Sequence, residues 1–179
     1  MNNCVNYLLT NPWPSFGPQK SDPLSVHRLY ALYAGPKSEM TAVTVYLYNS
    51  LLLGQDKDTG LSELFACVAR AEMYHLETLG KLLLAYGADP KYLSFINGRQ
   101  QWWNGGMPTY QKDARTMLRT ALRSEQDAIQ DYKQVSSNIA PEPKAVLDRI
   151  ILDEKHHIEL FEAALAALSP SPMPYRLDR

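Results

Sequence analysis

Apolar residues recur at intervals of three and four through most of the chain, and no long stretch alternates with a period of two. This spacing gathers apolar side chains on one face of a helix, so the pattern predicts an all-α fold. We expect a short helical piece and four long helices, spanning about 23–34, 36–54, 61–86, 109–138 and 141–168.

Glycine, proline and polar clusters indicate where these elements end. Gly35-Pro36 suits the start of the first long helix, as an N-cap followed by a first-turn proline. The segment 87–108 is too long for a tight turn; its Trp102 and Trp103 suit either anchoring by burial or a contact between chains. The expected organisation is an irregular N-terminal arm (1–22), a helical bundle (23–168) and a Pro-rich C-terminal tail (169–179).

The long helices fall into two similar halves. SEMTAVTVY at 38–46 matches SEQDAIQDY at 124–132, and EMYHLE at 72–77 matches EKHHIE at 154–159. Short loops join the first helix to the second and the third to the fourth, while one long crossover joins the halves. The sequence therefore predicts a four-helix bundle made of two antiparallel hairpins.

Each long helix carries a glutamate on its apolar face, and two of these glutamates are followed one turn later by a histidine. The six residues are Glu39, Glu72, His75, Glu125, Glu154 and His157. At ~1.5 Å per residue, all four glutamates lie roughly 17–22 Å from the loop that closes their own hairpin. They should therefore meet in one layer of the core.

Four carboxylates in an apolar layer need compensation, because desolvating each one costs several kcal/mol and their mutual repulsion adds more. Two divalent cations would balance the four negative charges. Oxygen-rich ligation with one imidazole per ion favours iron or manganese over structural zinc. The pattern therefore predicts a two-metal site.

Composition and charge exclude several other classes. The chain has 179 residues, 45% hydrophobic and 21% charged, with a formal net charge of −1, which is typical of a globular domain. It has no basic run of the kind that binds nucleic acid and no apolar stretch long enough to span a bilayer. The N-terminus lacks the features of a signal peptide, so a cytoplasmic location is expected. With only Cys4 and Cys67 we expect no disulfide framework, and Cys67 reads as a small buried residue.

On these motifs, residues 36–168 resemble the ferritin-like di-metal carboxylate superfamily, and rubrerythrins in particular, with dimanganese catalases slightly further off. The resemblance implies that Glu72 and Glu154 bridge or chelate both metals. It also implies that Glu39 and His75 complete the shell of one ion, and Glu125 and His157 that of the other.

The chain departs from rubrerythrins in two respects. Two cysteines cannot build the four-cysteine iron site of a rubredoxin domain. Rubrerythrins also carry an extra glutamate three residues after the ligand of the third helix, where this chain has Ala128. Both departures bear on the mechanism and leave the six ligands intact.

The resemblance implies an oxidoreductase with two Fe ions, alternatively two Mn ions, that acts on hydrogen peroxide or dioxygen. A rubrerythrin-like peroxidase would take electrons from an external donor protein, whereas a dimanganese catalase would need none. An iron-binding or storage protein without turnover, and a helical interaction module, are the other readings. We expect a homodimer, and no partner among nucleic acids or membranes.

Three further residues are expected to surround the ligands. Asp153 suits an acceptor for the ring N–H of His75, or else an exposed helix residue. Tyr46 and Tyr132 lie two turns beyond Glu39 and Glu125, either as core aromatics or as donors to the ligand carboxylates. Ala71 occupies the position equivalent to Asp153, so His157 must have a different partner.

Overall fold

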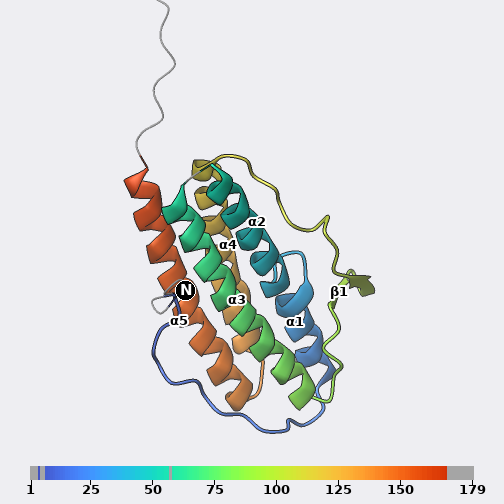
Figure 1. The fold of residues 1–179 in the computed structure, drawn as a ribbon. Helices are drawn as coiled ribbons and strands as arrows, with labels where there is room; N and C mark the ends of the chain where they lie inside the picture. Colours follow the sequence, from blue (N-terminus) through green and yellow to red (C-terminus); the bar gives the residue numbers. More distant parts are fainter. Residues whose placement is uncertain (1–3, 5–6, 57, 169–179) are drawn as a thin grey trace, which may run out of the picture.

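The fold is a bundle of long helices with a short helix and a β-hairpin along one side (Figure 1). The structure is a computed structural model that describes residues 4, 7–56 and 58–168. Its elements are α1 (Pro23–Ala34), α2 (Glu39–Gln55), α3 (Thr59–Ala85), β1 (Leu93–Ile96), β2 (Arg99–Trp102), α4 (Ala114–Ser136) and α5 (Pro141–Ala167). Helix α2 packs mainly against α3, and α4 against α5, so the two predicted hairpins are present.

Side-chain caps decide where four of the described helices begin, α2 and α4 among them. The Ser38 hydroxyl accepts the Thr41 N–H at 3.4 Å and starts α2, so the predicted start at Gly35-Pro36 is wrong. Gly35 instead caps the C-terminus of α1, where its N–H donates to the carbonyl of Ala31. Asp113 accepts the Thr116 N–H at 2.8 Å, and α4 therefore begins at Ala114, five residues after the predicted start.

The crossover between the halves contains a two-stranded hairpin that the periodicity did not indicate. Strands β1 and β2 are antiparallel, with Leu93 opposite Trp102 and Ile96 opposite Arg99. Asn97 and Gly98 form the turn with φ of 52° and 73°, the left-handed conformation that an Asn-Gly pair adopts readily. Just beyond β2, the Trp103 indole N–H donates to the Thr41 hydroxyl at 3.0 Å and ties the crossover to α2.

The apolar core has two parts along the bundle axis. One part surrounds Leu79, Leu82 and Ile150, and the other surrounds Phe65, Leu118 and Phe161, all of them at most 1% exposed. On both α3 and α5 the Glu-x-x-His motif lies between these two clusters along the helix. The fold thus places the polar layer in the middle of the core, between two apolar clusters.

One prediction about the cysteines is wrong. Cys67 on α3 is buried, as expected, but it is joined to Cys4 by a disulfide across 63 residues of sequence. The bond attaches the N-terminal arm to the bundle. Two cysteines so far apart carry no spacing signal, and only the folded chain brings them together.

The N-terminal arm has no helix or strand from Tyr7 to Asp22, and it is held against the bundle. Near its end it passes the C-terminus of α3, where the Gln19 N–H donates to the Ala85 carbonyl at 2.8 Å. It also passes the start of α5, where the Gly17 N–H donates to Glu142 Oε2 at 3.2 Å. The arm therefore packs along both helices that carry a Glu-x-x-His motif.

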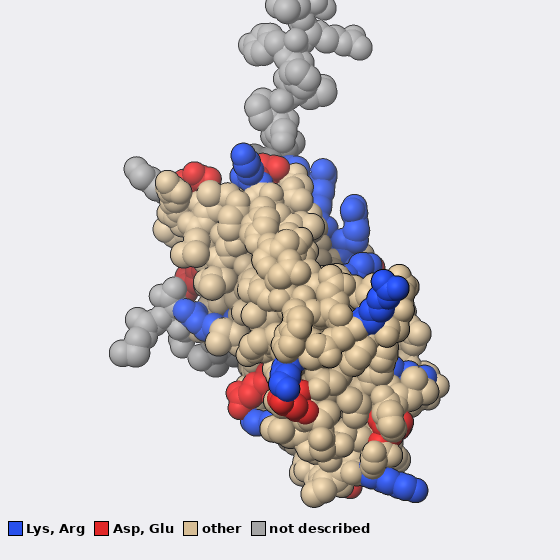
Figure 2. Space-filling model, turned by 90° about the vertical axis from the view of Figure 1, so that its right-hand side faces the viewer, with Lys and Arg blue, Asp and Glu red and all other residues tan. Residues whose placement is uncertain are grey.

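Neutral side chains cover much of the face shown in Figure 2, and the charged ones stand in small separate groups. Among the residues described there, no extended patch carries a single sign of charge. Within the described chain, no helix combines the length and apolar character that crossing a membrane requires.

Candidate metal centre

The structure brings all six predicted ligand residues together in the buried polar layer. Each is at most 5% exposed. Their side chains form two overlapping groups, and within each group the potential ligand atoms lie within 4.8 Å of one another. The first group consists of Glu39, Glu72, His75 and Glu154. The second group consists of Glu72, Glu125, Glu154 and His157. Glu72 and Glu154 therefore belong to both groups.

The first group centres on the Nδ1 atom of His75. This atom lies 2.9 Å from Glu72 Oε2 and 3.2 Å from Glu154 Oε1. Glu39 Oε2 is the most distant of its carboxylate neighbours, at 3.8 Å. One imidazole nitrogen thus faces three carboxylates that come from three different helices.

The second group repeats this arrangement around His157 Nδ1. That atom lies 3.1 Å from Glu72 Oε1 and 3.1 Å from Glu154 Oε2. Glu125 Oε2 lies 3.9 Å away. The repeat seen in the sequence thus appears as a pseudo-two-fold arrangement, with Glu72 and Glu154 between two imidazoles whose ring centroids are 5.9 Å apart.

Burial and the charges of neighbouring side chains shift the pKa values of all six residues. Burial, followed by repulsion from Glu72, raises the pKa of Glu39 and Glu125 well above the ordinary value. Burial also opposes ionisation of Glu72 and Glu154, but the two imidazoles outweigh it and lower the pKa of both carboxyls. Burial would disfavour the imidazolium forms, yet Glu154 beside His75 and Glu72 beside His157 raise both histidine pKa values.

The donor set suits divalent cations. Oε1 of Glu72 and Oε1 of Glu154 are buried acceptors without a hydrogen-bond partner, although each lies within 3.2 Å of an imidazole nitrogen. Buried oxygens in this condition are costly unless a proton or a cation satisfies them. Carboxylates with one imidazole on each side match the preference of Fe(II) or Mn(II).

Two tyrosines link the hairpins through the outer carboxylates. The Tyr46 hydroxyl donates to Glu125 Oε1, and the Tyr132 hydroxyl donates to Glu39 Oε1. Both tyrosines are 1% exposed, and burial is the main reason that their pKa values are raised well above the ordinary range. Each therefore remains a neutral donor to a buried carboxylate.

The Nε2 atoms of His75 and His157 have different hydrogen-bond partners. His75 Nε2 lies 3.3 Å from Asp153 Oδ2, the partner that sequence reasoning considered. His157 Nε2 lies 2.9 Å from the backbone carbonyl of Tyr7 in the N-terminal arm. Sequence reasoning anticipated that His157 needed another partner but could not identify it, because a main-chain carbonyl has no side-chain signature.

A cavity of about 220 Å³ leads to the carboxylates. Most of its wall comes from α2 and α4, and it reaches Glu39, Glu72, Glu125 and Glu154. Ala128 lies in this wall. Lys37 and Asp127 also line it, at a more exposed position where they form an ion pair of 2.7 Å. A cavity of this size admits small molecules and excludes large ones.

The fold and site together define a ferritin-like carboxylate bundle. A family model described as rubrerythrin matches residues 31–165, so the chain belongs to the rubrerythrin family. No curated protein sequence matches the chain.

Solved structures support the same architecture. The chain is similar to KatB, a manganese catalase from Anabaena, with a TM-score of 0.78, 19% identity and coverage of 94% of this chain and 86% of that one. It is also similar to bacterioferritin from Rhodobacter capsulatus, with a TM-score of 0.69, 20% identity and coverage of 83% and 87%. Bacterioferritin BfrA from Mycobacterium tuberculosis has a TM-score of 0.67, 21% identity and the same coverage, 83% and 87%. At these identities the comparisons establish the fold and leave the metal open.

Proposed function

We propose that this protein binds two iron ions at the six-residue centre and reduces hydrogen peroxide or dioxygen with electrons from an external donor. The observation that carries this proposal is the pair of overlapping ligand groups that share Glu72 and Glu154. Glu39 and His75 would complete the shell of one ion, and Glu125 and His157 that of the other. Two such ions, when bound, supply the two electrons that the reduction of one peroxide molecule consumes.

The residues around the centre would provide protons and exclude bulk water. Reduction of hydrogen peroxide to two water molecules takes up two protons as well as two electrons. The hydroxyls of Tyr46 and Tyr132 adjoin the carboxylates of Glu125 and Glu39, at the cavity wall. They can hold those carboxylates in place and supply protons beside the point where a small oxidant arrives.

The cavity supports a small substrate. Its volume of about 220 Å³ holds peroxide or dioxygen easily but is small for most organic metabolites. Apolar residues such as Leu32, Val45 and Met107 form part of its wall and suit the passage of a small neutral molecule.

A dimanganese catalase is the second candidate, and Ala128 is the observation that favours it. Its methyl group lines the cavity where rubrerythrins carry a further glutamate, so no seventh carboxylate reaches the ions from this position. A catalase would use peroxide as both oxidant and reductant and would need no donor protein.

The first test concerns the centre itself. Crystals soaked with Fe(II) or Mn(II) should show two anomalous peaks about 3.5–4 Å apart among the six residues. Glu72→Ala should remove both peaks, because this carboxylate belongs to both groups, whereas Glu77→Ala on the exposed side of α3 should keep them. A centre that stays empty at millimolar metal would refute the proposal.

The second test separates the two reactions. Protein loaded with each metal is given hydrogen peroxide, with and without an added reductant. If the iron-loaded protein consumes hydrogen peroxide only when reductant is present, the result supports the proposed reaction. Sustained oxygen evolution by the manganese form without reductant would make the protein a catalase. If it instead assembles into a closed cage by size-exclusion chromatography and turns over neither substrate, it is an iron-storage protein.

A further inference from the structure

The N-terminal arm contacts the outer nitrogen of His157 directly. Tyr7 lies three residues after Cys4, and its carbonyl oxygen is 2.9 Å from His157 Nε2. A carbonyl can only accept, so Nε2 must carry a proton, and loss of the other ring proton then leaves the lone pair of Nδ1 facing the carboxylates. Tyr7 is therefore a positioning residue, acting on the ligand through its main chain.

The arm reaches the other imidazole through Asp153. The Leu9 N–H donates to Asp153 Oδ1 at 2.9 Å, while Asp153 Oδ2 lies 3.3 Å from His75 Nε2. The orientation of this carboxylate thus depends on the arm as well as on its own helix, and through it the arm also orients His75.

Arg149 on α5 holds this stretch of the arm in place. Its guanidinium lies 2.7 Å from Asp153 Oδ2 and donates to the carbonyls of Leu9 at 2.6 Å and Asn11 at 3.1 Å. The same group lies 4.6 Å from the centroid of the Trp13 ring. The orientations of His75 and His157, the two histidines proposed as metal ligands, thus both depend on one stretch of the arm's backbone.

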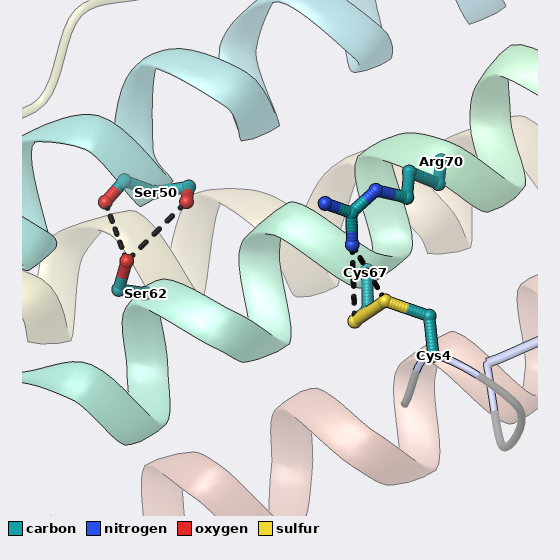
Figure 3. Close-up of a disulfide and its surroundings, with 5 residues drawn as sticks. All are labelled: Cys4, Ser50, Ser62, Cys67 and Arg70. Carbon is teal, nitrogen blue, oxygen red and sulfur yellow. Dashed lines mark hydrogen bonds between the residues drawn. A yellow bond between two sulfur atoms is a disulfide. The ribbon is translucent and has the colours of Figure 1, made fainter. Parts of the chain in front are cut away.

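The Cys4–Cys67 disulfide joins the N-terminal end of this arm segment to α3 (Figure 3). Cys67 is 1% exposed, whereas Cys4 is partly exposed at the surface. The Arg70 guanidinium lies 2.7 Å from Cys4 Sγ and 3.7 Å from Cys67 Sγ, so a positive charge is adjacent to both sulfurs. Such a charge stabilises a thiolate leaving group and makes a disulfide easier to open.

We propose that the Cys4–Cys67 disulfide is a redox-sensitive clasp: a dithiol reductant opens it, releases the arm from the two histidines and weakens metal binding at the centre. The inference rests on the proposed function, because it assumes that His75 and His157 bind metal. It adds a modification site outside the centre and assigns positioning roles to Tyr7 and Leu9.

The chemistry of opening is ordinary thiol–disulfide exchange. A thiolate of the reductant attacks the accessible Cys4 sulfur, the Cys4–Cys67 bond breaks, and Cys67 leaves as a thiolate beside Arg70. The second thiol of the reductant then displaces Cys4. Two electrons pass from the dithiol to the protein disulfide, so the reductant becomes a disulfide and the protein gains two thiols. Disulfides in cytoplasmic proteins are mostly transient or redox-sensing, which agrees with the expected location.

The test compares Mn(II) binding by the full chain in its two redox states. Metal-free protein is reduced with dithiothreitol, the reagent is removed by anaerobic gel filtration, and the dissociation constant is measured from the electron paramagnetic resonance of free Mn(II). Loss of outer hydrogen-bond partners of a ligand histidine typically weakens metal affinity 10- to 100-fold, and a weakening of about that size is expected on reduction. The visible spectrum of the Co(II)-loaded protein should also change, because it reports coordination and not stability.

Three variants separate the clasp from a general loss of structure. Cys4→Ser should bind Mn(II) as weakly as the reduced protein and should not respond to dithiol. Leu9→Pro keeps the disulfide but removes the N–H that orients Asp153, so it should weaken binding in the oxidised state. Ser62→Ala removes the 2.8 Å hydrogen bond from its hydroxyl to the Ser50 carbonyl, near Cys67 but away from the arm (Figure 3). That control should respond to dithiol as the parent does.

The outcomes are distinct. Equal affinity and identical Co(II) spectra in the two redox states would overturn the clasp while leaving the metal centre intact. Failure of the oxidised protein to bind Mn(II), Fe(II) or Co(II) would overturn the proposed function and the clasp together. Circular dichroism of reduced metal-free protein should remain helical, and a reduced chain that unfolds outright would also contradict a local clasp.

Discussion

The hydroxyl of Tyr132 on α4 donates a hydrogen bond to Oε1 of Glu39 on α2, so each helical hairpin helps to hold a carboxylate of the other. The repeat supplies the reverse contact, from Tyr46 on α2 to Glu125 on α4. Each of these carboxylates belongs to one ligand group only. The two hairpins therefore contact each other at Glu39 and Glu125 as well as at the shared carboxylates of Glu72 and Glu154.

The first prediction concerns the hydrogen bond from Tyr132 to Glu39. Tyr132→Phe removes the hydroxyl and leaves a buried oxygen of Glu39 without its partner, which should destabilise the metal-free protein by about 1–3 kcal/mol. Urea denaturation followed by circular dichroism measures the change. Tyr110→Phe, whose hydroxyl donates to Gly105 at the exposed crossover, should change stability by no more than about 0.5 kcal/mol. Equal effects of the two substitutions would contradict the structural role of Tyr132.

The second prediction concerns linkage between metal and stability. On the proposed function, Fe(II) or Mn(II) binds the folded centre and not the unfolded chain. Saturating metal at about 100 times its dissociation constant should therefore stabilise the fold by ~2.7 kcal/mol and raise Tm. Glu72→Ala should abolish this increase, because both groups lose the same carboxylate. Metal-free Glu72→Ala should melt lower than the parent, because the two imidazoles stabilise the ionised form of Glu72 and its removal leaves them without this buried partner. If metal raises the Tm of this variant as much as that of the parent, Glu72 is not a ligand shared by two metal ions.

The third prediction concerns pH. Glu39, Glu125, His75 and His157 all have pKa values raised above the ordinary range, so the metal-free fold keeps protons on them to higher pH than the unfolded chain does. Their contribution to the stability of the metal-free fold is therefore present at low pH and lost as pH rises through the raised pKa values. Metal must displace these protons, so its affinity should increase with pH. Calorimetric titration in buffers of different ionisation enthalpy should show protons released on binding; proton uptake would contradict the assignment.

The fourth prediction concerns the cavity. Ala128→Leu should fill part of the cavity wall and slow peroxide consumption by the metal-loaded protein, while the number of metals bound stays at two. Ala145→Leu introduces the same side chain at an exposed position on α5 and serves as the control. If the variants react with peroxide at the same rate, the substrate reaches the centre by another route.

Much of the fold was available from the sequence because its signals are local. Residues three and four apart share a helix face, so periodicity located α3 and α5 within about two residues of their observed ends. The repeat then placed a glutamate at matching depth in each helix, and the six side chains do meet in one buried layer. The start of α4 was less accurate, because helix ends depend on caps such as Asp113 and not on period.

The sequence by itself determined which residues share the buried layer, since helical period and the internal repeat are properties of neighbouring positions. Only the tertiary structure decided how the N-terminal arm meets that layer. The Tyr7 carbonyl meets His157 across 150 residues of chain, and Cys4 meets Cys67 across 63. A main-chain oxygen looks the same at every residue, and a pair of cysteines carries no mark of its partner. Such contacts depend on where the arm comes to lie once the helices have packed, which no local pattern in the arm specifies.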